Sequence, residues 1–162
     1  MATLSHLTHS VGMPGVILTT DLSEESKRAF APARDLAKKL GMQIRLVAVL
    51  EELPFEPSGG GLVAAYPDRE QVRADWQAEV DKLAAEVGRD VCVEAKVIEG
   101  VDVAHAIVEF AEQQGADYIA MATHGRSGLR RLLLGSVAEL VIRHSHVPVV
   151  VYPPAKAPAA EA

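Results

Sequence analysis

Residues 118–136 read Tyr-Ile-Ala-Met-Ala-Thr-His-Gly-Arg-Ser-Gly-Leu-Arg-Arg-Leu-Leu-Leu-Gly-Ser. An apolar run, Tyr118–Ala122, leads straight into a segment that is punctuated by glycine. Gly125 and Gly128 allow the main chain to approach a ligand without a Cβ atom in the way. We therefore predict a strand that ends in a ligand-binding loop, with Arg126 between the two glycines.

The end of this segment predicts the start of a helix over residues 136–145. Ser136 and Glu139 have the Ser-x-x-Glu spacing of a capping box, which predicts a helix start at Ser136. The free N–H groups and the positive dipole end of such a helix form a natural seat for a phosphate. The alternative is that Gly135 and Ser136 only cap the helix and that the earlier glycines only form a turn.

Strands and helices alternate along the rest of the chain. Apolar or alternating runs predict five strands, at Val16–Thr19, Ile44–Leu50, Val91–Ile98, Tyr118–Ala122 and Val147–Tyr152. Helical periodicity predicts four helices, starting near Asp21, Asp68, Asp102 and Ser136. This order implies a doubly covered parallel α/β sheet with right-handed crossovers. Such sheets bind ligands beyond the carboxyl ends of their strands where the strand order reverses, which points to strands one and four.

Helical spacing also predicts which side chains face inward. These are Ala29, Ala33, Leu36, Ala37 and Leu40 in the first helix, Trp76, Val80 and Leu83 in the second, and Val103, Ile107, Phe110 and Ala111 in the third. We interpret Trp76 as a core residue rather than a ligand-binding one. Pro32 is expected to kink the first helix or to cost it about 3 kcal/mol. Asp102 is expected to be an N-cap, and His105 to lie at the surface.

Composition narrows the class of protein. Hydrophobic residues make up 49% and charged residues 23% of the 162, so one ordinary globular domain is expected. A net charge of −6 argues against nucleic acid or an anionic membrane as the main partner. Four arginines and one acid nevertheless fall between Ala122 and His146, a basic island that suits a small anionic ligand.

The remaining segments set the expected boundaries. Residues 1–13 and 153–162 are interpreted as flexible ends around a domain at 14–152, and 52–67 as a functional or disordered loop. Cys92 is the single cysteine, interpreted as a buried, inert thiol that fits a reducing compartment. With no signal peptide or apolar span in the sequence, we expect a cytoplasmic protein without a membrane partner.

Asp21 follows the first predicted strand and should lie beside the glycine segment. A carboxylate there can accept hydrogen bonds from ribose hydroxyls, or hold Mg²⁺ or Mn²⁺ that bridges nucleotide phosphates. The alternative is a simple helix cap.

At this point the chain resembles the universal stress protein family, of the single-domain, ATP-binding type. The resemblance is carried by residues 16–23, by Ala122-Thr123-His124-Gly125 followed by nine residues and Gly135-Ser136, by 99–122 and by 147–151. The family signature is Gly-x-x-Gly-x9-Gly-Ser/Thr, and Ala122 replaces its first glycine. An alanine there weakens binding if the position needs a positive φ or close contact with the ribose.

The resemblance implies a Rossmann-like sandwich of the adenine nucleotide α-hydrolase type, with strand order 3-2-1-4-5 and a homodimer formed through strand 147–152. It implies ATP as ligand and unknown protein partners. The candidate nucleotide-binding residues are Thr19, Thr20, Asp21, Val49, Met121, Ala122, Gly125, Arg126, Gly128, Gly135, Ser136, Val137 and Ala138. Within this set Thr20, Asp21 and Val49 are implied for adenine and ribose, and Gly125, Gly135, Ser136 and Val137 for phosphate.

Efficient catalysis is not expected from this set. No phosphate-binding motif ending in Gly-Lys-Ser/Thr is present, and no lysine lies between Lys96 and Lys156. The leading hypothesis is a stress-response regulator that binds ATP without efficient turnover. A nucleotide-free dimer that acts through protein partners and a slow ATPase remain the alternatives. An apolar edge strand over 147–152 favours dimerisation, and Pro148 is expected to remove one donor from that edge.

Overall fold

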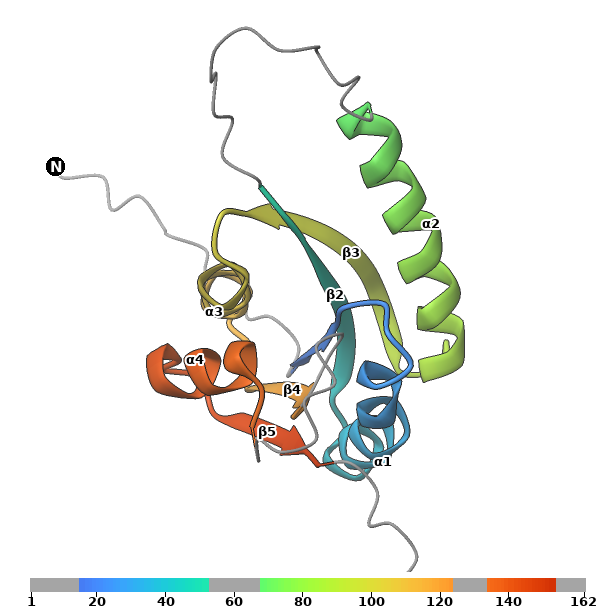
Figure 1. Cartoon of the computed structure of the whole chain (residues 1–162). Helices are drawn as coiled ribbons and strands as arrows, with labels where there is room; N and C mark the ends of the chain where they lie inside the picture. Colours follow the sequence, from blue (N-terminus) through green and yellow to red (C-terminus); the bar gives the residue numbers. More distant parts are fainter. Residues whose placement is uncertain (1–14, 53–67, 124–133, 154–162) are drawn as a thin grey trace, which may run out of the picture.

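The computed structural model describes residues 15–52, 68–123 and 134–153. Strands and helices alternate through these residues (Figure 1). In chain order they are β1 (Gly15–Thr20), the 3₁₀ helix η1 (Ser26–Ala29), α1 (Phe30–Leu40), β2 (Gln43–Glu51), α2 (Arg69–Val87), β3 (Cys92–Gly100), α3 (Val103–Gln113), β4 (Tyr118–Ala122), α4 (Ser136–His144) and β5 (Val149–Tyr152). The predicted alternation is confirmed, and β4 has the predicted bounds.

The five strands form one parallel sheet in the order β3-β2-β1-β4-β5. β1 lies at its centre, where Leu18 is paired with Leu46 of β2 and with Ala120 of β4. The order that the family resemblance implies is therefore confirmed. Because the chain moves outward from β1 in both directions, the order reverses at β1, and the strand ends there leave a crevice.

Two hydrophobic clusters cover the two faces of the sheet. Val16 and Leu18 of β1 pack with α1 and α2, whereas Ile17 packs with α3 and α4. Figure 1 shows these helix pairs on opposite sides of the sheet. All six residues of β1 are buried, as expected for a central strand of a doubly covered sheet.

The outer edge of β3 is closed by a side chain of α2. The amide of Gln77 donates to the carbonyl of Ala95 and accepts from the N–H of Val97, both at 2.9 Å. Gln77 thereby takes the place of a neighbouring strand at these two backbone groups. An edge that is covered in this way is less open to pairing with another chain.

The first helix differs from its prediction. η1 occupies Ser26–Ala29, and α1 begins only at Phe30, so Pro32 lies in the first turn of α1. The expected kink is wrong because N–H groups of a first turn have no α-helical partner, and proline loses little there. Leu40 is 52% exposed, so its predicted inward position is also wrong, whereas Ala29, Ala33 and Ala37 are buried. Gly41 ends the helix with φ +66°, as its stop signal predicts.

Three other predictions can be compared with the structure. Asp102 is confirmed as the N-cap of α3, accepting from the N–H of His105 at 2.7 Å. Cys92 is half-buried rather than fully buried, and burial raises the pKa of its thiol, which favours the unreactive form. Pro148 is exposed, but its backbone carbonyl accepts from the N–H of Ile119 of β4, so its backbone groups point toward β4 rather than toward the outer edge. The expected loss of a donor from the outer edge is wrong, because alternate residues of a strand turn their backbone groups to opposite sides.

Candidate functional site

The carboxyl ends of β1, β2 and β4 surround a cavity of about 510 Å³. Its wall is completed by α2, α3 and the first turn of α4. The lining residues are Thr19, Thr20, Asp21, Ser26, Val47, Val49, Leu50, Glu51, Trp76, Val103, Ile107, Met121, Ala122, Thr123, Gly135, Ser136, Val137 and Ala138. The cavity therefore lies at the crevice that the strand order creates.

Ten of the candidate residues from the sequence line this one cavity. They are Thr19, Thr20, Asp21, Val49, Met121, Ala122, Gly135, Ser136, Val137 and Ala138. The remaining three, Gly125, Arg126 and Gly128, lie outside the described residues. The structure thus brings together side chains from β1, β2 and β4 with the start of α4, although their roles toward a ligand stay predictions.

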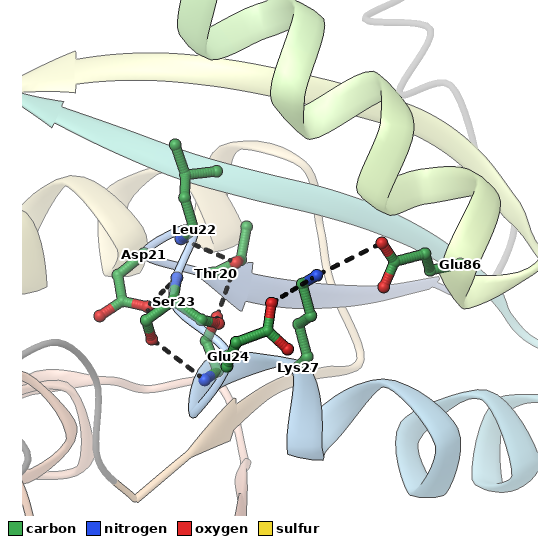
Figure 2. Close-up of polar contacts among 8 residues, drawn as sticks. Thr20, Asp21, Leu22, Ser23, Glu24, Lys27 and Glu86 are labelled. Carbon is green, nitrogen blue, oxygen red and sulfur yellow. Dashed lines mark hydrogen bonds and ion pairs between the residues drawn. The ribbon is translucent and has the colours of Figure 1, made fainter.

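Asp21, at the end of β1, is held by a tight turn (Figure 2). Its Oδ1 accepts from the N–H of Ser23 at 3.1 Å and from the hydroxyl of Ser23 at 2.5 Å. Between them, Leu22 has φ +67°, a left-handed conformation that costs a branched side chain about 1–2 kcal/mol. Asp21 is not a helix cap, because η1 begins five residues later at Ser26. The turn fixes the carboxylate at the cavity wall.

Ser26 supports the same turn from below. Its hydroxyl is buried and donates to the carbonyl of Ser23 at 2.8 Å. The hydroxyl of Thr20 lies 2.8 Å from it and must therefore be the donor in that pair, while Thr20 Oγ1 accepts from Leu22 N–H at 3.1 Å. Ser26 was not among the residues predicted for the site, and it lines the cavity as well.

An ion-paired lysine ties this turn to α2. Lys27 contacts Glu24 at 2.9 Å and Glu86 of α2 at 3.3 Å (Figure 2). The hydrogen bond with Glu24 is the main cause that raises the pKa of Lys27, and Glu86 adds to it. Exposed pairs of this kind contribute little to stability. The pair with Glu86 links η1 to α2 at the surface.

The start of α4 forms another part of the cavity wall. Gly135 is the N-cap, with an extended backbone at φ −72° and ψ 154°, and its N–H donates to the carbonyl of Thr123 at 2.7 Å. The predicted helix start at Ser136 is confirmed, but the predicted capping box is wrong, because Gly135 is the N-cap and no side chain caps the helix. Glu139 instead forms an ion pair with Arg143 at 2.7 Å. The main-chain N–H groups of the first turn therefore face this part of the cavity with the positive dipole of the helix.

Ala122, which replaces a glycine of the family signature, is the last residue of β4 and pairs with Tyr152. Among the described residues other than glycine, only Leu22 has a positive φ. The alanine at 122 thus lies in ordinary strand conformation and meets no backbone penalty here.

Aliphatic side chains and one indole form the remaining wall. Val47, Val49 and Leu50 come from β2, Val103 and Ile107 from α3, and Met121 from β4. Trp76 of α2 packs against the hydrophobic core, as predicted, and lines the cavity as well. Sequence analysis missed this second position, because helical periodicity reports only that Trp76 faces inward.

The charges of the site are distributed unevenly. Among the described lining residues, Asp21 and Glu51 are acidic and none is basic. Arg143 lies on the outer face of α4, paired with Glu139, and the other three arginines of the basic island fall outside the described residues. Over the same described ranges, no three His, Cys, Asp or Glu side chains gather as a metal site. The described wall can bind and orient a ligand through main-chain donors, a carboxylate and apolar contacts.

Comparison with known proteins places the chain in a family context. The model of the universal stress protein family matches residues 15–153. Universal stress protein MJ0531 of Methanocaldococcus jannaschii is 37% identical over 138 residues, covering 84% of this chain and 79% of that protein. Universal stress protein YxiE of Bacillus subtilis is 27% identical, covering 84% and 96%.

Solved structures share the fold. The protein MJ0577 superposes with a TM-score of 0.69 at 24% identity, covering 91% of this chain and all of that one. A universal stress protein in complex with cAMP gives 0.62 at 20% identity, with coverages of 88% and 98%. One from Archaeoglobus fulgidus in complex with dAMP gives 0.55 at 22%, with coverages of 86% and 96%. No helix in the described part of this chain is long and apolar enough to cross a membrane.

Proposed function

This chain belongs to the universal stress protein family, and we propose that its cavity binds an adenine nucleotide, with ATP as the physiological ligand. One observation carries the proposal: the cavity wall has apolar, acidic and N–H-donating parts on successive elements, and a nucleotide has a base, a ribose and phosphates in the same order. Val47, Val49 and Leu50 line the cavity at β2 together with the acidic Glu51, a fixed carboxylate lines it after β1, and the first turn of α4 supplies helix N–H groups. Base, ribose and phosphate would occupy these three parts in turn.

The middle and the polar end supply the specific contacts of this proposal. Asp21 is positioned by Ser23 to accept from ribose hydroxyls, as acids at such strand ends do in nucleotide-binding folds. The first turn of α4 offers N–H donors to phosphate oxygens. The solved relatives with cAMP and dAMP support an adenine nucleotide as ligand, since both of those compounds contain adenine.

The proposed role is that of a stress-response regulator that binds ATP without efficient turnover. Ligand binding would order the cavity wall and change the surface that protein partners meet. Mg²⁺ or Mn²⁺ would enter with the nucleotide phosphates, with Asp21 as the candidate protein ligand. The absence from the sequence of a phosphate-binding motif that ends in Gly-Lys-Ser/Thr supports binding over efficient phosphoryl transfer.

We also propose a homodimer formed through β5. This strand is the outer strand on its side of the sheet, and its four residues are half-buried apolar or tyrosine side chains. The backbone groups of Val149 and Val151 face away from β4, because those of Pro148 and Tyr152 bond to it. α4, next to β5 in Figure 1, exposes Leu140 and Ile142.

The phosphate seat can be tested by removing a single main-chain donor. Ser136 is the first residue of α4, where proline is well tolerated, and the extended Gly135 before it suits a following proline. Ser136→Pro should weaken ATP binding about tenfold, since a hydrogen bond to a charged group contributes about 1.5–3 kcal/mol. Titration calorimetry with ATP and with adenosine measures the effect, and adenosine affinity should stay within about twofold.

Ser136→Ala is the matched control, because it removes the hydroxyl and keeps the N–H. Its ATP affinity should remain within about threefold of the original chain. Equal ATP affinity of the proline and alanine variants would contradict a seat at α4. A chain that binds no adenine nucleotide at millimolar concentration would contradict the proposed function and support the nucleotide-free dimer.

A further inference from the structure

We propose that Trp76 is the stacking platform for the nucleotide base and makes this site prefer purines to pyrimidines. The inference rests on the proposed function and adds a specificity-determining residue to it. Trp76 is the single tryptophan of the chain, and it enters the cavity from α2, which contributes no other lining residue.

The placement of α2 brings Trp76 to the cavity. Arg69, at the start of α2, contacts Glu52 at 3.4 Å and Glu99 at 3.0 Å. These acids lie directly after β2 and near the end of β3. The first half of α2 is thereby held at the carboxyl edge of the sheet, where the cavity lies.

The neighbouring residue fixes the rotation of α2 about its axis. Gln77 bonds to the carbonyl of Ala95 and the N–H of Val97 on β3, each at 2.9 Å. With Gln77 bound to the sheet edge, Trp76 is turned toward the strand ends. A platform held in this way loses little conformational entropy when a ligand binds, which favours affinity.

The burial along this face of α2 separates Trp76 from the core residues that follow it. Val80, Leu83 and Val87 are at most 1% exposed, whereas Trp76 is only half-buried. The largest side chain of the stripe thus keeps part of its surface on the cavity. An aromatic side chain that packs against the core and also lines a cavity can stack on a flat ligand there.

Aliphatic side chains from the other face of the sheet line the same cavity. Trp76 packs with the α1 and α2 side of the sheet, whereas Val49 and Ile107 pack with the α3 and α4 side. All three line the same cavity, so it joins the two faces at the end of β1. A planar base would lie between the indole and the aliphatic side chains, and a purine would cover more of the indole than a pyrimidine.

The test measures the ratio of ATP to UTP affinity by titration calorimetry. The original chain should bind ATP about tenfold more tightly than UTP. Trp76→Leu should reduce this ratio to within about twofold, and Trp76→Phe, which keeps a ring, should retain most of it. Thermal unfolding without ligand identifies any loss of folding in either variant.

Fluorescence gives an independent readout in the unmodified chain, because its tryptophan emission comes from Trp76 alone. ATP should change that emission with a midpoint equal to the calorimetric dissociation constant. An unchanged emission at saturating ATP, or an unchanged ATP/UTP ratio in Trp76→Leu, would overturn the role of Trp76 and leave nucleotide binding intact. Absence of ATP binding to the unmodified chain would instead remove the proposed function itself.

Discussion

The two sides of β1 are built differently. On one side, β2 and β3 have nine residues each, and Gln77 of α2 closes the outer edge of β3. On the other side, β4 has five residues and β5 four, and the outward backbone groups of β5 form the sheet edge. The cavity is lined from both sides, by residues of β2 and by residues of β4 and the start of α4.

The β4–β5 side also holds polar groups that the described chain leaves without partners. The buried hydroxyls of Tyr118 and Tyr152 have no hydrogen-bond partner within the described residues. The first N–H groups of α4 face the cavity, and β5 presents its edge. The β2–β3 side thus has its outer edge covered by a side chain of α2, whereas the β4–β5 side ends in the backbone of β5. The dimer proposed above would pair this second edge.

The largest expected effect is the loss of the proposed dimer when the β5 edge is altered. Val151→Pro removes one outward N–H group and leaves the bonds from β4 to β5 in place, since proline is tolerated at an edge. The unmodified chain should be a dimer by light scattering at micromolar concentration, and Val151→Pro should have half its mass. Far-UV circular dichroism checks that the variant remains folded.

Gln77→Ala is the control at the other edge of the sheet. It uncovers the β3 edge and should leave the mass of the dimer unchanged. A monomeric unmodified chain, or a folded Val151→Pro variant that stays dimeric, would contradict pairing through β5.

A smaller effect is expected on stability at the β3 edge. Gln77→Ala removes two hydrogen bonds to the sheet and should lower the free energy of unfolding by about 1–2 kcal/mol. Gln71→Ala is the matched control, since Gln71 and Gln77 each bond to an aspartate four residues later, Asp75 and Asp81. Its cost in urea unfolding should be below about 0.5 kcal/mol. Equal costs for the two variants would show that the edge contact contributes nothing.

The smallest effect at neutral pH is expected at Tyr118. Burial is the main cause that raises the pKa of Tyr118 to about 12, with Tyr152 and Asp117 adding to it. The unfolded phenol ionises near pH 10 while the folded one stays neutral, so ionisation does not affect stability below pH 10 and lowers it as the pH rises from 10 toward 12. Tyr118→Phe should leave stability at pH 7 unchanged or slightly higher, because it removes a buried hydroxyl without a partner.

Urea unfolding at pH 7 and pH 11 measures this dependence. Tyr118→Phe should lose less stability between the two pH values than the original chain does. Burial raises the pKa of Tyr152 as well, so part of the loss should remain, and Tyr152→Phe provides the comparison. An identical loss in the original chain and in Tyr118→Phe would contradict a raised pKa at Tyr118.

Local sequence patterns predicted much of the fold. Tyr118–Ala122, the N-cap at Asp102 and the stop at Gly41 agree with the structure, because each depends on neighbouring residues alone. The first helix was less predictable. Acids at 24 and 25 suggested an early start, but the turn at Asp21 and the hydroxyl of Ser26 delay α1 until Phe30.

In the candidate site, too, some residues could be predicted from local sequence patterns and others could not. Asp21, Gly135 and Ser136 could be named from the sequence, because strand ends and helix starts carry recognisable residues. Trp76 and Ser26 could be assigned to the cavity only from the structure.

The sequence by itself thus determined the alternation of strands and helices and, through family resemblance, the strand order and the polar candidates of the cavity. Only the tertiary structure decided that Trp76 reaches the same cavity as Asp21. It also decided that Gln77 covers one edge of the sheet, whereas β5 forms the other edge. The physical reason is the sequence separation of the residues that interact. Periodicity and capping depend on residues within a turn or two, whereas these contacts depend on how α2 packs across strands far away along the chain.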